Sequence, residues 1–534
     1  MGAAGMEEDP VSGSSHGDQA ARDDAHLQSL GIKPELQRTL GFLSNFAVAF
    51  SYISVSTGTF TLIALGLGVA GPAFFWSWPI IIIGQTFVAL NFAELSSHFP
   101  VAGSIYQWSK RLANKTLGWF TGWIYFWAGV LTTTAVAITV PLVVGGILGQ
   151  DLSKQPFLFT NVQVAIALGT LVVTTLVNAF GIRLLSLINN IGVAAEILGM
   201  LVFALILLVL HTNQPLSVLT TTAGAESATN GNYLPIFLIG MFMSLFVVFG
   251  FDTAGTFGEE TLDAARQAPR GILSAIWISG VIGAVFLLAI ILSTPDMAAA
   301  LTDTAPIATA IKSNLGSFGD VYLFVILFAV SVCTLAIQGA TARLMFSMGR
   351  DRRLPLGSTW GHVSTQFKTP TNAAIAVGVL AGVPLLVTDS PFLLAGGATG
   401  LIYISYFLCN LGVFMARRKG WPHGPAWFSL KSWGSVVNLA ALIWGGAMIV
   451  NFALWNAPSW FGDFAAFRDY TNPLINGLSF FGTKLDWLPA IPIFEATLGT
   501  LLIAGAVVYA AGERLKAVDT SVEADAATGE VTIG

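Results

Sequence analysis

"STGTF", residues 56–60, lies in the middle of an apolar segment that extends from about residue 40 to residue 67. Such a segment predicts a membrane-spanning helix, because the bilayer core requires about 20 apolar residues per helical span. Glycine and small hydroxyl residues are weak helix formers, and a broken helix in the bilayer leaves backbone groups without water. A second stretch, "TAGTF" at residues 253–257, has the same Ser/Thr-x-Gly-Thr-Phe pattern inside another apolar segment.

Composition indicates an integral membrane protein. Of the 534 residues, 54% are hydrophobic and 10% are charged, and the mean hydropathy is +0.73. A soluble protein of this size cannot bury so much apolar surface. We therefore expect an all-α integral membrane protein with twelve transmembrane helices. The expected spans are residues 41–66, 72–97, 118–149, 161–181, 187–210, 234–258, 272–294, 318–343, 371–388, 392–415, 435–455 and 489–511.

The basic residues predict the orientation of these spans. With a cytoplasmic N-terminus, 20 of the 24 Lys and Arg fall on the cytoplasmic side, and only Lys154, Lys312, Arg468 and Lys484 fall outside. This asymmetry follows the positive-inside rule. We expect a multi-pass protein of the plasma (cytoplasmic) membrane with both termini in the cytoplasm.

Few residues offer enzymatic or metal chemistry. Cys333 and Cys409 both lie within expected spans, which favours buried apolar filler over a disulfide or a metal site. The six histidines fall in tails and loops without metal-ligand spacing, and no nucleotide-binding loop or nucleophile motif occurs. We expect no enzymatic activity, no metal and no cofactor.

The two repeated stretches predict interrupted helices. Gly58 and Gly255 allow unusual backbone angles, and the neighbouring hydroxyl groups can cap the ends of half-helices. The N-terminus of a second half-helix is partly positive and suits a carboxylate. Close packing of two helices is the alternative for either stretch alone. Because the stretches fall in spans 1 and 6, we expect two inverted five-helix units, an arrangement found in many secondary transporters.

These units divide the chain. Residues 39–416 form the expected transporter core of helices 1–10, and residues 417–512 hold the accessory helices 11 and 12. The hydrophilic residues 1–38 and 513–534 lack an apolar stripe, so we expect disordered cytoplasmic tails.

Further stretches carry a resemblance to a known family. They are "AELSSHFPVAGSIYQW" (93–108), "NAFGIRLLSLINNIGVAAEILG" (178–199), "FGFDTAGTFGEETLDAARQAPRGI" (249–272), "ARLMFSMGRDRRLP" (342–355) and "TPTNAAIA" (369–376). In this order the chain resembles the amino acid–polyamine–organocation (APC) transporters, within them the amino acid, γ-aminobutyrate and choline permeases. Ser56 stands where the family usually has its first glycine of the span 1 break.

The substrate is expected between the two interrupted helices. Its carboxylate would meet amides around Ser56, Thr57 and Gly58, and its amine would meet groups between Phe249 and Thr253. The resemblance implies that Phe246 covers the substrate, where a packed core phenylalanine is the alternative. The expected substrate-binding residues are Ser56, Thr57, Gly58, Thr59, Phe246, Phe249, Gly250, Phe251, Asp252 and Thr253. For Asp252, a cap on the broken helix is the alternative to an amine contact.

Two further sets of ionisable residues are candidates for transport. Glu196 lies inside span 5, where several relatives carry a lysine that stands in for sodium. An acid in a low dielectric can carry a proton, so we expect Glu196 to be the proton-coupling group, with a structural hydrogen bond to span 1 as the alternative. A latch on the cytoplasmic side is expected from Glu94, Glu259 and Glu260 with Lys110, Arg111, Arg266 and Arg270, and the alternative is a solvated charge cluster. Arg350, Arg352 and Arg353 are interpreted as topology determinants.

The sequence thus predicts a permease that carries a small amino acid or related amine by alternating access and needs no cofactor. Proton symport is expected, and sodium coupling stays open. A choline or polyamine carrier and an amino acid exchanger are alternatives within the class. A channel and a non-transporting receptor are alternatives outside it. No protein partner and no nucleic acid are expected.

Overall fold

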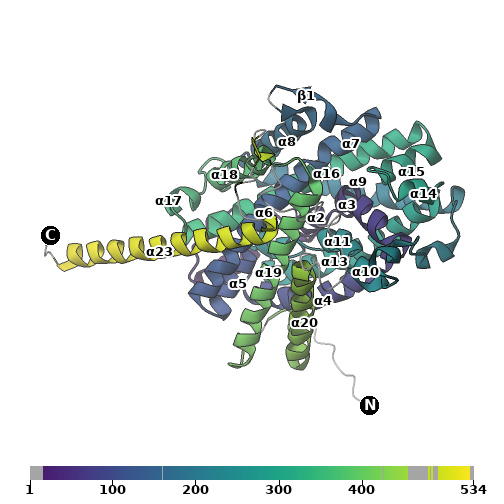
Figure 1. Ribbon diagram of the computed structural model, residues 1–534. Coiled ribbons are helices and arrows are strands. Elements are labelled where there is room, and N and C mark those ends of the chain that lie inside the picture. Colours follow the sequence, from purple (N-terminus) through teal and green to yellow (C-terminus); the bar gives the residue numbers. More distant parts are fainter. Residues whose placement is uncertain are drawn as a thin grey trace, which may run out of the picture.

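The computed structural model describes residues 16–158, 160–424, 426–454, 479–480, 483–484, 487 and 491–528. Residues 1–15 and 529–534 of the expected tails, and Arg468 of the expected outer side, lie outside this set. The described strands form two short antiparallel pairs, β1 (Pro156–Phe157) with β2 (Thr160–Asn161) and β3 (Ser479–Phe480) with β4 (Thr483–Lys484). The rest of the regular structure is helical (Figure 1).

Among the described residues, ten helical segments are long and apolar enough to cross a membrane, and the shorter apolar segments Tyr233–Val247 and Thr371–Leu386 add two. Together they match the twelve expected spans in order, which confirms the all-helical membrane fold. Spans 1–6 are α2 (Phe42–Ile53) with α3 (Val55–Ala70), α4 (Ser77–His98), α6 (Lys115–Ala137) with α7 (Thr139–Leu148), α8 (Val162–Ala179), α9 (Ile182–Leu210), and α10 (Tyr233–Gly240) with α11 (Phe242–Val247) and α12 (Thr253–Thr256). Spans 7–12 are α13 (Ala264–Ser293), α16 (Phe318–Arg350), α18 (Thr371–Gly382), α19 (Pro391–Arg417), α20 (Gly434–Leu454) and α23 (Ile493–Thr528).

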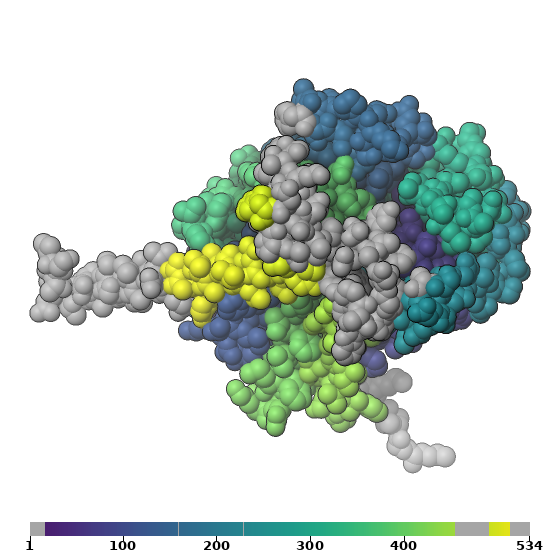
Figure 2. Space-filling model, in the orientation of Figure 1, coloured from purple at the N-terminus to yellow at the C-terminus, as the bar shows by residue number. Residues whose placement is uncertain are grey.

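Shorter helices connect these spans. On the side of the N-terminus they are α5 (Ser104–Leu112) and α17 (Gly357–Trp360), and α14 (Met297–Ala300) and α15 (Pro306–Leu315) join spans 7 and 8 on the other side. The accessory helix α20 packs beside α19, and the two lie together at the lower edge of the molecule in Figures 1 and 2. Helix α23 packs on α6 and α19, and its C-terminal part extends beyond them (Figure 1).

The helix packing reflects the two expected five-helix units. Span 2 packs on span 7, span 3 on span 8 and span 4 on span 9. Span 3 also contacts span 10, just as span 8 contacts span 5. An odd number of spans in each unit places the second unit in the opposite orientation. The two interrupted spans pack on each other through α3 and α11 at the centre of this arrangement.

Span 1 is interrupted before the quoted stretch rather than within it. Ser54 separates α2 from α3 and adopts a left-handed conformation with φ 32°. "STGTF" itself is helical and forms the first turns of α3. The prediction of a break within "STGTF" is therefore wrong. The stretch instead marks the start of α3, since hydroxyl residues suit a helix N-terminus.

The interruption in span 6 also lies before its repeated stretch rather than within it. The chain is unwound between the end of α11 at Val247 and the start of α12 at Thr253, and Gly250 has φ 89°. Two side chains satisfy the unwound backbone: Gln85 Nε2 donates to the Val248 carbonyl over 2.9 Å, and the Gly250 amide donates to the Tyr406 hydroxyl over 2.9 Å. Buried backbone groups in a membrane protein need such partners.

The segment expected as a disordered N-terminal tail contains helix α1 (His16–Ser29). Its sequence is rich in alanine, with Asp18 in the first turn and His26 in the last, a charge order that suits the helix dipole. Leu27 of this helix is 1% exposed, because it packs with Ile32 and Val101. An apolar contact with the connection after span 2 thus orders a segment that has no apolar stripe of its own.

Candidate functional site

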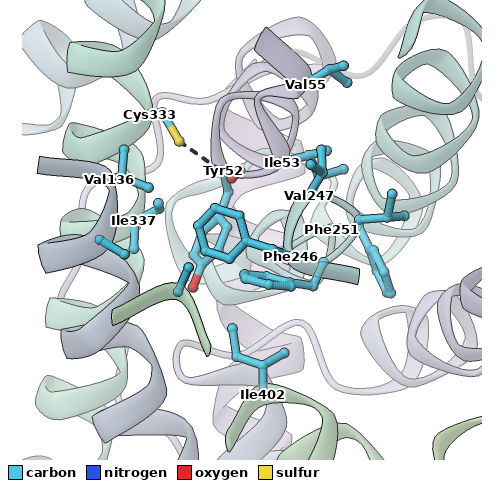
Figure 3. Packing of buried hydrophobic residues seen from close by; sticks show 14 of the residues in the cluster. Tyr52, Ile53, Val55, Val136, Phe246, Val247, Phe251, Cys333, Ile337 and Ile402 are labelled. Atoms are coloured by element: carbon cyan, nitrogen blue, oxygen red, sulfur yellow. Dashed lines mark hydrogen bonds between the residues drawn. The ribbon is translucent and has the colours of Figure 1, made fainter. Parts of the chain in front are cut away.

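A small cavity lies between the two interrupted spans. Its lining comes from spans 1, 3, 6 and 8 and consists of Tyr52, Ile53, Thr57, Gly58, Thr132, Val136, Phe246, Phe249, Cys333 and Ile337. About 10 Å³ of it is accessible to water, close to the minimum for one molecule. Figure 3 shows Val136 and Ile337 on one side of the Tyr52 ring and Phe246 on the other. The lining contains hydroxyl, thiol and apolar groups but no charged side chain.

The first turn of α3 forms one wall of this cavity. Thr57 and Gly58 line it directly. The Gly58 amide donates to the Ser54 carbonyl over 3.1 Å, whereas the Thr57 amide belongs to the first turn, whose amides have no acceptor within their own helix. A Cβ atom on Gly58 would lie 2.6 Å from Val247 Cγ2, so the glycine allows α3 to approach α11 closely. The expected carboxylate-binding turn is therefore at the cavity, although Ser56 and Thr59 are not among its lining residues.

Glu196 binds the same helix N-terminus from span 5. Its Oε1 accepts hydrogen bonds from Ser54 Oγ over 2.9 Å, from the Ser56 amide over 3.1 Å and from Ser56 Oγ over 2.7 Å. The side chain of Glu196 is buried, and among the described residues no Lys or Arg forms an ion pair with it. The hydrogen bond to span 1 expected as an alternative is present, and its donors are all neutral.

Aromatic side chains form the span 6 wall. The rings of Phe246 and Phe249 meet edge to face at 5.8 Å between centroids, and Tyr52 lies 6.2 Å from Phe249. Phe251 instead packs against Phe92 and Tyr406, away from the lining residues. At Gly250 a Cβ atom would lie 2.0 Å from the Tyr52 ring, so only glycine fits both this contact and the positive φ.

Asp252 lies in a separate polar cluster. Its carboxylate accepts hydrogen bonds from Tyr406 (2.5 Å), Tyr125 (2.7 Å) and Ser104 (3.1 Å). These hydroxyl groups come from span 10, span 3 and α5, and we call the four residues the Asp252 junction. Asp252 is fully buried, does not line the cavity and makes no side-chain cap on α12, so neither sequence interpretation describes its contacts.

The remaining predicted site residues are buried without clear partners. Thr59 and Thr253 each have a buried hydroxyl oxygen with no hydrogen-bond partner among the described residues. Of the predicted substrate-binding set, Thr57, Gly58, Phe246 and Phe249 line the cavity. Four further lining residues, Tyr52, Thr132, Cys333 and Ile337, and two partners of Asp252, Tyr125 and Tyr406, were not among the predicted site residues. A polar or aromatic group inside an apolar span was the available signal, but spacing alone does not show which helix face meets the cavity.

Ion pairs join the helix ends on the side of the N-terminus. Glu260 binds Arg343 with two hydrogen bonds of 2.7 and 2.9 Å, and Glu259 binds Arg350 with two of 2.8 Å. Further pairs are Glu94 with Arg417 and Asp351 with Lys110. The predicted acids are therefore in ion pairs, but the prediction of their basic partners is wrong. The observed partners lie toward the ends of spans 8 and 10. Arg350, interpreted as a topology determinant, is one of them.

The other predicted latch cations have different contacts. Arg266 and Arg270 lie over the Trp427 ring at 5.7 and 5.0 Å, and Arg111 donates to the Leu30 carbonyl over 2.9 Å. Burial would raise the pKa of Asp351, but the nearby Lys110 ammonium and the hydrogen bonds from Lys110 and Tyr106 outweigh it and lower that pKa. Asp351 thus holds a negative charge between α5 and the end of span 8.

Comparisons with known proteins agree with this architecture. The model of a family described as "Amino acid permease" matches residues 40–462. The Arabidopsis thaliana amino-acid permease BAT1 is 31% identical over 463 residues, which cover 80% of this chain and 87% of that protein. Its homolog in Oryza sativa subsp. japonica is 30% identical over 456 residues, with the same coverage. An uncharacterized amino-acid permease of Schizosaccharomyces pombe is 24% identical, over 81% of this chain and 80% of its own length.

These matches extend across the interrupted spans, the cavity and the ion pairs, and their names describe permeases rather than enzymes. The chain belongs to the amino acid permease family of the APC superfamily, whose members carry amino acids or amines across membranes.

Proposed function

We propose that this permease carries a small neutral amino acid across the plasma membrane by proton-coupled symport. The observation that carries the proposal is the uncharged cavity between the N-terminus of α3 and the end of α11, with Glu196 bound to that N-terminus. A zwitterion needs a site for its carboxylate, and the first turn of α3 supplies backbone amides for one. Its amine would meet carbonyls of the unwound segment after Val247.

The cavity lining favours this substrate over a polyamine or choline. A polyamine has several cationic groups, and a buried cation without a nearby anion is strongly unfavourable. Phe246, Phe249 and Tyr52 offer cation–π contacts to one amine, but the lining has no acid for a second. The carboxylate of Asp252 already accepts three hydrogen bonds.

The coupling mechanism follows from competition at the N-terminus of α3. A substrate carboxylate bound at the Thr57 amide would lie next to the Ser56 amide that Glu196 binds, and two like charges in a buried site repel each other. Protonation of Glu196 removes the repulsion and weakens its hold on the Ser56 amide, so substrate and proton bind together. Sodium is the alternative coupling ion, and no cofactor and no obligatory protein partner is required.

Alternating access then requires two barriers to open in turn. The ion pairs and the Asp252 junction close the path on the side of the N-terminus, which we place in the cytoplasm on the basis of the basic residues. Release on that side requires the ion pairs of Glu259 and Glu260 to separate.

The test is uptake by the purified protein in proteoliposomes, with labelled neutral amino acids, γ-aminobutyrate, choline and putrescine offered with and without an inward proton gradient. We expect saturable uptake of a neutral amino acid that rises with the gradient. Uptake of only choline or putrescine would contradict the carboxylate site, and uptake that needs sodium but no proton gradient would contradict the coupling.

A further inference from the structure

Helix α1 contacts two connections that also hold the ion pairs. Its first contact is apolar: Leu27 of α1 and Ile32, which follows the helix, pack with Val101, and Phe99 and Leu30 lie against this cluster. Val101 lies between span 2 and α5, and Arg111 of α5 donates to the Leu30 carbonyl over 2.9 Å. The first contact therefore attaches α1 to the connection between spans 2 and 3.

The second contact attaches α1 to the connection between spans 6 and 7. The Asp263 amide donates to Asp23 Oδ2 over 2.8 Å. Arg38, which follows α1, donates to Asp24 Oδ1 over 3.0 Å and to the Thr261 carbonyl over 3.0 Å. One helix thus joins two connections that are more than 150 residues apart in the sequence.

The two connections already meet at Glu259. Its Oε1 accepts a hydrogen bond from the Ala102 amide over 2.9 Å, next to Val101, and its carboxylate binds Arg350. In the segment that connects α1 to α2 of span 1, the Thr39 and Leu40 amides donate to the Glu260 carbonyl. Helix α1 therefore spans the groups that hold span 1, the span 2–3 connection and span 6 together.

We propose that α1 is an inhibitory strap that stabilises the state closed on the side of the N-terminus and must detach before that side opens. The proposal rests on the alternating access described under the proposed function. Opening separates the ends of spans 1 and 6 from α5, and α1 cannot keep both of its contacts when they separate. Detachment therefore adds to the free energy of opening.

The test uses the full chain with Leu27→Ala and Ile32→Ala combined, and Gln28→Ala as the matched control, because Gln28 is exposed on the same helix. Two introduced cysteines report the two steps: Val101→Cys packs with Leu27 of α1, and Ser347→Cys is buried on α16 between the ion-paired Arg343 and Arg350. Cys333 and Cys409 are buried, so the protein without either reporter gives the background. Labelling with a membrane-impermeant maleimide is measured from the side of the N-terminus.

We expect the double variant to increase labelling at both reporters about tenfold, the order expected from loss of buried apolar groups at a docking contact. The initial rate of substrate efflux should also rise. Gln28→Ala should leave the efflux rate and the labelling of both reporters unchanged. Faster labelling of Val101→Cys without faster labelling of Ser347→Cys would overturn the strap, since α1 would then cover the surface without restraining it. Unchanged labelling of Val101→Cys would overturn the docking itself.

The same experiment separates this proposal from the proposed function. Both labelling readouts report conformations and need no substrate. If no substrate is transported but labelling changes as expected, the strap stands and the proposed substrate and coupling fail. If transport occurs with a proton gradient but the double variant does not change Ser347→Cys labelling, the proposed substrate and coupling are supported and the inhibitory role of α1 is contradicted.

Discussion

Tyr406 is the residue whose hydroxyl group holds the unwound part of span 6 most directly. It accepts a hydrogen bond from the Gly250 amide and donates one to Asp252. Tyr406→Phe removes both bonds and leaves a buried amide without a partner. An unsatisfied buried donor costs about 1–3 kcal/mol, and a hydrogen bond to a charged group contributes about 1.5–3 kcal/mol. We expect a loss of about 3–5 kcal/mol in the free energy of unfolding.

The matched control is Tyr322→Phe. Tyr322 is also fully buried in a span, but its hydroxyl oxygen has no hydrogen-bond partner among the described residues. Its removal should leave stability unchanged or raise it slightly, because no bond is lost. The comparison therefore isolates the hydroxyl bonds of Tyr406 from the general effect of shortening a tyrosine.

The assay follows thermal unfolding in detergent with a thiol-reactive fluorescent dye, because the two cysteines are buried in the fold and become reactive on unfolding. Tyr406→Phe should lower the unfolding temperature clearly, and Tyr125→Phe, which loses one hydrogen bond to Asp252, should lower it less. If Tyr406→Phe unfolds at the same temperature as Tyr322→Phe, the Asp252 junction does not stabilise the unwound segment and the reasoning fails.

Three further predictions concern other parts of the structure. Gly250→Ala should abolish correctly folded protein in size-exclusion profiles, because φ is positive and the new Cβ would meet the Tyr52 ring at 2.0 Å. Glu260→Gln should reduce stability by about 3–5 kcal/mol in the same thermal assay, since it leaves the buried Arg343 charge unpaired. Burial raises the pKa of Asp23 in the docked state, so docking of α1 should strengthen as pH falls through that raised value, and Val101→Cys labelling should slow. The groups that face Asp23 are Asp263, Arg38, Gln19 and Asp24.

Each of these has a control in the same chain. Gly499→Ala adds a Cβ where nothing lies within 4 Å, and it should fold normally. Lys154→Gln breaks an exposed ion pair with Asp151 and should change stability by less than about 1 kcal/mol. Asp23→Asn should remove the pH dependence of labelling that Asp23 causes. Equal effects of a variant and its control would contradict the corresponding prediction.

The spans and their order could be predicted because bilayer thickness fixes the length of an apolar helix. The interrupted helices could be found from the repeated stretch, but the break at Ser54 could not, since a left-handed serine leaves no compositional signal. The glycines of the repeat serve packing and helix starts instead. Gly250, which does have a positive φ, lies outside the repeat.

The contacts of the charged groups were harder to predict. Local spacing favours partners in neighbouring connections, but Arg343, Arg350 and Arg417 reach Glu260, Glu259 and Glu94 across the bundle. Helix α1 was missed for a related reason: its apolar contact consists of one buried leucine on a polar helix, and the groups that order it come from distant connections. Such tertiary contacts do not appear in local hydropathy.

The most direct measurement for the proposed mechanism is the proton dependence of uptake by Glu196→Gln in proteoliposomes, with Asp151→Asn on an exposed loop as the control. A glutamine keeps an acceptor oxygen for Ser54 and Ser56 but cannot gain or lose a proton. We predict that the wild type and Asp151→Asn concentrate substrate with an inward proton gradient, whereas Glu196→Gln only equilibrates it at a rate that the gradient does not change. Gradient-driven accumulation by Glu196→Gln would contradict the assignment of the coupling proton to Glu196.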